Sequence, residues 1–128
     1  MKIKSIYEDH TRAIKYTEPN LDAEWEEANR YREFKILGKD AWLKQARIGK
    51  VENWSSLGYV GNVCTDLSAL ESDKVERVQS AIKRDEVELP IVGRWPDGTL
   101  DLIAGNTRIA TLLNIGIDPK VWVVDVPK

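Results

Sequence analysis

The most constraining feature of this sequence is a strand that runs directly into a helix. Residues 90–104 predict a β-hairpin, because two apolar, β-branched runs flank a Pro-Asp-Gly turn at 96–98. A glycine then ends the second strand, and residues 106–115 carry apolar side chains at helical spacing. The β-branched run at 121–126 predicts a buried strand. The order strand, turn, strand, helix, strand is typical of an α+β fold.

The expected sheet is small and mixed, with helices packed against it. Its strands are expected at residues 60–65, 90–95, 99–104 and 121–126, and its helices at 73–84 and 106–115. Asp73 followed three residues later by Glu76 resembles a capping box, which marks the start of the first of these helices. Residues 59–128 are therefore expected to form one α+β domain.

Residues 1–58 predict a helical extension to this domain. Apolar side chains recur at three- and four-residue spacing over 21–37, which predicts one continuous helix. A second helix fits 40–47, and Gly49 is suited to end it. Residues 50–60 have mixed polarity and predict a loop.

The charge of the chain excludes one class of function. The formal net charge is −2 over 128 residues, whereas a protein that wraps DNA mainly by charge is normally basic. Any nucleic-acid contact must therefore come from a local patch. There is no secretory signal and no apolar run long enough to span a membrane, so a cytoplasmic protein is expected. Cys64 is the only cysteine, which excludes an intrachain disulfide and favours a small buried residue.

The chemistry is expected at the strand–helix junction, in the sequence Gly105-Asn106-Thr107-Arg108. The start of a helix presents unpaired backbone N–H groups and the positive end of the helix dipole. A cation is unfavourable there, so Arg108 in the first turn indicates an anion held between its guanidinium and the backbone. The alternative is ordinary capping by Asn106 or Thr107, with Arg108 on a solvated face.

Residues 66–126 resemble the ParB/sulfiredoxin superfamily. The resemblance rests on the helix that ends Gln79-Ser80-Ala81-Ile82-Lys83-Arg84, on the strand Pro90-Ile91-Val92 and on Leu102-Ile103-Ala104-Gly105. It implies a phosphate site at Gly105 and Arg108, which match the family's glycine and last arginine. It also implies a nucleoside triphosphate, ATP or CTP with Mg²⁺, and a phosphotransferase or NTPase activity.

The chain departs from the family patterns at the positions that carry their chemistry. ParB domains have Gly-Glu-Arg-Arg where this chain has Gly105-Asn106-Thr107-Arg108, and sulfiredoxins have a nucleophilic cysteine at the position of Asn106. No helix-turn-helix region follows within the sequence. The resemblance therefore favours a nucleotide site but leaves open a non-catalytic nucleic-acid-binding module, or a regulatory protein with a relic nucleotide site.

Catalysis on a phosphate needs a base or a metal-binding carboxylate near the junction. We predict Asp66 and Asp101 as the candidates. Each has a structural alternative: Asp66 precedes a helix and can cap it, and Asp101 alternates with two leucines and can face solvent or a cleft.

The segment 31–50 carries six basic and two acidic side chains, interleaved with aromatic residues. Such a mixture can bind phosphates and stack bases, which makes Lys44 and Arg47 candidate contacts to DNA or RNA. Trp95, next to the hairpin turn, is a further candidate for stacking if it is exposed. The alternative is an amphipathic helical pair with buried aromatic residues and solvated cations.

Overall fold

The computed structural model describes residues 14–127, and its main sheet has four strands in the order β2-β6-β4-β5. The sheet is mixed, because β6 pairs antiparallel with β2 and parallel with β4, and β4 pairs antiparallel with β5. A separate parallel pair joins β1 to β3. The strands are β1 (Lys15–Thr17), β2 (Lys50–Asn53), β3 (Glu86–Glu88), β4 (Ile91–Arg94), β5 (Leu100–Ala104) and β6 (Lys120–Asp125).

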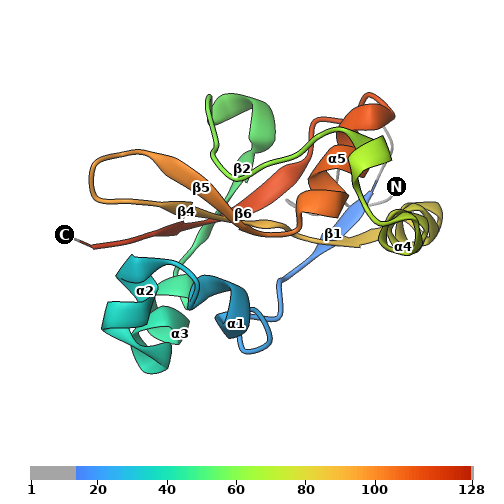
Figure 1. Cartoon of the computed structure of the whole chain (residues 1–128). Helices are drawn as coiled ribbons and strands as arrows, with labels where there is room; N and C mark the ends of the chain where they lie inside the picture. Colours follow the sequence, from blue (N-terminus) through green and yellow to red (C-terminus); the bar gives the residue numbers. More distant parts are fainter. Residues whose placement is uncertain (1–13, 128) are drawn as a thin grey trace, which may run out of the picture.

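Helices cover both faces of this sheet (Figure 1). They are α1 (Trp25–Ala28), α2 (Arg32–Leu37), α3 (Lys39–Arg47), α4 (Ser72–Lys83) and α5 (Asn106–Asn114), with 3₁₀ turns η1 (Trp54–Ser56) and η2 (Leu67–Ala69). Figure 1 shows α2 and α3 below the sheet and α5 above it. Successive side chains of β6 point to opposite faces of the sheet. Trp122 and Val124 pack into the core cluster that contains Trp42. Val121 and Val123 pack into the cluster on the other face, which contains Ile109.

Tryptophan side chains hold the N-terminal segment together and attach it to the sheet. Trp42 is fully buried, and its Nε1 donates to the carbonyl oxygen of Leu21 at 2.9 Å. Trp122 Nε1 donates to the carbonyl oxygen of Ala46 at 2.8 Å. Trp95 is 7% exposed and cannot stack on a partner, which corrects the expectation of an exposed side chain there. Each of these tryptophan rings is buried with its indole N–H donating a hydrogen bond, so burial of the ring leaves no unpaired polar group.

The α+β class is confirmed, as are the hairpin, the helix after it and the final strand. The expected strand at 60–65 is wrong. Only Gly61 forms an isolated bridge, to Asp101 at the free edge of β5, and Asn62 then takes a left-handed backbone with φ +61°. The fourth strand is instead β2, inside the predicted loop at 50–60. Its mixed polarity is explained by its place at the edge of the sheet, where Glu52 pairs with Arg94 at 2.9 Å.

The expected continuous helix over 21–37 is also wrong. It is divided into α1 and α2, because Tyr31 takes an extended backbone that lets its hydroxyl donate to the carbonyl oxygen of Leu102 at 2.6 Å. The described part of the predicted extension 1–58 is not purely helical, since it contributes β1 and β2 and shares one core cluster with β6. Its residues 1–13 lie outside the described part. No helix within residues 14–127 is long and apolar enough to span a membrane.

Candidate functional site

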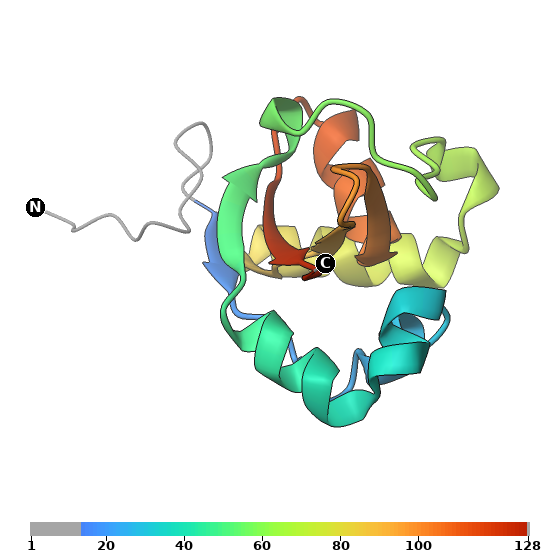
Figure 2. The same cartoon turned by 90° about the vertical axis from the view of Figure 1, so that its left-hand side faces the viewer.

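A cavity of about 780 Å³ lies where β5 ends and α5 begins. One wall is the β5–α5 junction, Leu102 to Arg108. A second wall comes from α4, through Lys74, Arg77 and Val78, and a third from α1 and the residues just after it. Figure 2 shows how these walls come together, with α5 above α4 and the short N-terminal helices below it. The fold therefore places the predicted junction in a concave site.

Gly105 makes the sharp turn from β5 into α5. Its φ is +98°, in the left-handed region, and a Cβ atom at this position would lie 2.7 Å from Cβ of Pro90. Only glycine fits this conformation and this spacing without strain. In the part of the chain that the structure describes, no side chain caps the helix that follows, so the backbone N–H groups of the first turn remain available to a ligand.

Asn106 and Thr107 do not act as the caps that the alternative interpretation required. The Asn106 side chain instead holds the loop beside it: Oδ1 accepts from the backbone N–H of Cys64 at 2.8 Å, and Nδ2 donates to the Cys64 carbonyl oxygen at 3.0 Å. Thr107 lines the cavity, and its carbonyl oxygen accepts from the Thr111 hydroxyl at 2.7 Å. Any phosphate contact by Asn106 is therefore through its backbone rather than its amide.

Arg108 lines the cavity and is not a solvated side chain. Its side chain is 21% exposed, and its Nη1 donates to the carbonyl oxygens of Glu88 and Leu89 at 3.0 and 3.3 Å. The same atom lies 3.3 Å from Glu88 Oε2. Among the described residues these contacts all use Nη1, so the guanidinium keeps further N–H groups for a ligand.

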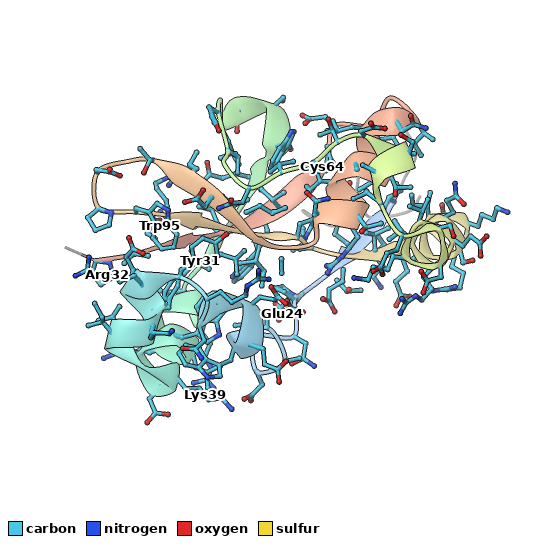
Figure 3. The ribbon with its side chains drawn as sticks, viewed as in Figure 1. Glu24, Tyr31, Arg32, Lys39, Cys64 and Trp95 are labelled. Carbon is cyan, nitrogen blue, oxygen red and sulfur yellow. The ribbon has the colours of Figure 1, made fainter. Side chains whose placement is uncertain are left out.

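Glu24 is the carboxyl group most affected by this environment. It lines the cavity, and Figure 3 shows it on the side of α1 that faces the sheet. Burial raises its pKa above the ordinary value. The Arg108 charge opposes this rise, while the Glu88 and Glu27 carboxylates add to it. Glu24 is therefore easier to protonate than an ordinary glutamate.

Three further cations line the cavity, and sequence reasoning missed all of them. They are Arg30, Lys74 and Arg77. Within residues 14–127 the ion-pair partner of each is an exposed local carboxylate, at 3.0 to 3.5 Å, and such exposed pairs contribute little and reorient easily. The only signal in the sequence was the three-residue spacing that puts Lys74 and Arg77 on one face of α4. With Arg108, four cations face Glu24 and Glu27 in a chain of net charge −2.

Neither predicted catalytic carboxylate lines the cavity. Asp101 accepts from Trp95 Nε1 at 2.6 Å through Oδ2 and from Asn62 Nδ2 at 3.1 Å through Oδ1. Asp66 is exposed and accepts from the hydroxyl and the N–H of Ser68, and the hydroxyl contributes most to a lowered pKa. Asp66 therefore caps η2, and Asp101 holds together the strand, the hairpin turn and the loop beside it.

The predicted nucleic-acid contacts, Lys44 and Arg47, lie on the exposed surface of α3 and do not line the cavity. The aromatic residues that were to form a stacking platform with them lie elsewhere. Phe34 and Trp42 are fully buried, and Tyr31 lines the cavity. What remains on this surface is charge without a stacking surface.

Cys64 is exposed, which corrects the expectation that it is buried. Its sulfur lies in the loop that Asn106 holds. Among residues 14–127, no group of three or more His, Cys, Asp and Glu side chains is arranged to hold a metal ion.

No family model, no curated protein and no solved structure matches this chain. The resemblance to ParB/sulfiredoxin domains therefore stays a prediction from the sequence.

Proposed function

We propose that this protein binds a nucleotide, with the phosphates held at the start of α5. The observation that carries the proposal is the convergence on one cavity of two anion-binding elements. The first is the uncapped first turn of α5 after Gly105, and the second is a set of four cations from three different parts of the chain. Helix N–H groups and guanidinium groups both favour phosphate oxygens, and their effects add when they surround the same anion.

The size and charge of the cavity support a small ligand with several negative charges. A volume of about 780 Å³ is within the range of sites for small molecules and cofactors. Four cations against two carboxylates favour a polyphosphate over a neutral ligand. The sequence resemblance to ParB/sulfiredoxin domains separately implies a nucleoside triphosphate, ATP or CTP, at Gly105 and Arg108.

Phosphoryl transfer or triphosphate hydrolysis remains the proposed activity of the site, with different carboxylates from those that the sequence indicated. Glu24 and Glu27 line the cavity, whereas Asp66 and Asp101 do not. Two carboxylates beside bound phosphates suit Mg²⁺, which keeps several waters and takes most of its other ligands from the phosphates. Mg²⁺ would neutralise phosphate charge, and Arg108 would orient the phosphates from the side of β3.

Thermal unfolding with a ligand panel tests the binding proposal. The panel is inorganic tripolyphosphate, ATP and CTP, each with and without Mg²⁺, followed by an assay for released phosphate. A ligand at 100 times its dissociation constant stabilises by about 2.7 kcal/mol. Stabilisation by tripolyphosphate alone is expected, and inorganic sulfate at equal ionic strength is the control. Unchanged melting temperatures at millimolar concentrations of every member would refute the proposal.

A second candidate is binding of duplex nucleic acid by the outer surface of α2 and α3. The observation in its favour is a set of exposed cations on these helices for which no ion pair is found within residues 14–127: Arg32, Lys35, Lys44 and Arg47. Without exposed aromatic rings this surface can contact phosphates but cannot stack bases. Such contacts would be independent of base sequence and would weaken as salt rises.

A further inference from the structure

The side-chain amide of Asn62 is fixed in one orientation at the rim of the cavity. Its Nδ2 donates to the Tyr31 hydroxyl oxygen at 3.2 Å and to Asp101 Oδ1 at 3.1 Å. The Tyr31 hydroxyl gives its own proton to the carbonyl oxygen of Leu102, and a carboxylate oxygen can only accept. Turning the amide over would place its oxygen against two acceptors. The chemistry of the partners therefore assigns the two ends of this amide.

Backbone hydrogen bonds also fix the position of the Asn62 main chain beside β5. Gly61 donates to the carbonyl oxygen of Leu100 and accepts from the N–H of Leu102, both at 2.9 Å. A Cβ atom at Gly61 would collide with the Asp101 carboxylate. Asn62 follows in the left-handed conformation, where asparagine is tolerated better than most residues. Its side chain is exposed and lines the cavity. With Nδ2 engaged on two partners, the group that Asn62 offers to a ligand is the acceptor Oδ1.

Asn62 lies on the rim of the cavity, beside the strand β5 that leads to the phosphate site. It is held beside Leu102, and the first turn of α5 begins at Asn106. β5 is extended only as far as Ala104, and Gly105 then turns the chain, so this separation is at most about 13 Å. A nucleoside triphosphate is long enough to cover this separation, so with phosphates at Gly105 and Arg108 its nucleobase can reach Asn62.

We propose that Asn62 Oδ1 accepts a hydrogen bond from the 6-amino group of adenine or the 4-amino group of cytosine, and so selects these bases over bases that lack an amino group at that position. The inference rests on the proposed nucleotide function and names the feature of the ligand that the rim of the cavity recognises. A base that presents a carbonyl oxygen here meets an acceptor that cannot turn over.

Calorimetric titrations with paired ligands test this selection. The pairs are ATP with purine riboside triphosphate, which lacks the amino group, and CTP with UTP; tripolyphosphate measures the phosphate site alone. For the natural chain we expect the amino member of one pair to bind roughly 3- to 10-fold more tightly, which is the net worth of one such hydrogen bond. Asn62→Gly removes the amide but suits the same backbone conformation, so it is expected to fold.

In Asn62→Gly the preference is expected to fall to about onefold, with unchanged affinity for tripolyphosphate. Tyr31→Phe removes one of the two acceptors that orient the amide and is expected to reduce the preference in part. Asn114→Ala, at the far end of α5, is the matched control and should keep the preference. The inference is overturned if neither pair is distinguished, or if Asn62→Gly keeps the preference, while tripolyphosphate still binds. Loss of tripolyphosphate binding in the natural chain would instead refute the proposed function, and the selection with it.

Discussion

The molecule has two positively charged regions, and they differ in what surrounds the charges. In the cavity, Arg108 is mostly buried beside the uncapped first turn of α5, and Arg30, Lys74 and Arg77 complete a concave site. On α2 and α3, cations such as Lys44 and Arg47 are exposed on an outer helical surface. Arg30, Lys74 and Arg77 are themselves exposed, so the difference lies in Arg108 and the aligned N–H groups beside it. A mostly buried arginine with aligned N–H groups can fix one small anion, whereas dispersed surface charges can only attract an extended one. Charge alone does not distinguish a binding site from a solvated surface, but the shape around it does.

The largest expected effect comes from Arg108→Ala. A charge-assisted hydrogen bond is worth about 1.5–3 kcal/mol, so affinity for tripolyphosphate should fall about 10- to 100-fold. The variant should also lose stability, because Arg108 Nη1 binds the carbonyl oxygens that end β3. Calorimetric titration gives the first effect and thermal unfolding by circular dichroism the second. Arg32→Ala, an exposed arginine outside the cavity, is the control. Natural affinity in a folded Arg108→Ala variant would remove the distinction between the two regions.

The second effect concerns the α2–α3 surface. Reversing two charges by Lys44→Glu with Arg47→Glu should weaken duplex DNA binding by about tenfold at low salt and lower the salt dependence by about two phosphate contacts. Tripolyphosphate affinity should hardly change, since neither residue lines the cavity. Fluorescence anisotropy with labelled duplex at several salt concentrations measures both quantities. If the natural chain binds no duplex at low salt, this surface is simply solvated.

The smallest expected effect comes from Glu24→Gln. The substitution removes a negative charge from the anion site, and tripolyphosphate affinity should rise about two- to fivefold at pH 7. In the natural chain affinity should increase as the pH falls through the raised pKa of Glu24, because the neutral carboxyl no longer repels phosphate. This increase should be smaller in the variant.

The raised pKa of Glu24 also affects the stability of the fold. Because the pKa of Glu24 is higher in the folded protein than in the unfolded chain, the folded state loses stability as the pH rises from below the unfolded pKa through the folded pKa. Glu24→Gln should therefore melt at a higher temperature than the natural chain at pH 7. An identical pH profile in both proteins would exclude Glu24 from the site.

The sequence correctly predicted the helices and strands whose own residues favour the same structure that they adopt in the folded protein. The hairpin, α5 and β6 have strong turns, a terminating glycine and regular apolar spacing, and the strand–helix junction was found for the same reason. It failed where a tertiary contact decides the backbone. Tyr31 divides the expected helix to reach Leu102, and β2 is a strand only because β6 pairs with it.

The candidate site follows the same division. Gly105 and Arg108 could be predicted because their roles depend on neighbours in the sequence. Arg30, Lys74 and Glu24 could not, since only packing of α1 and α4 around the junction brings them to one cavity. The catalytic role predicted for Asp101 lacks support, because the pattern of side chains along β5 indicates which face Asp101 is on but not which groups it contacts. Those groups are Trp95 and Asn62.

Nuclear magnetic resonance can locate the phosphate site directly, by following the backbone amide signals while tripolyphosphate is added. A phosphate site at the start of α5 predicts saturable shifts of the amide signals of Asn106, Thr107 and Arg108, with smaller shifts at Lys74 and Arg77. The amides of α3 should not move. Shifts confined to α2 and α3, or none that saturate, would contradict a phosphate site at the start of α5.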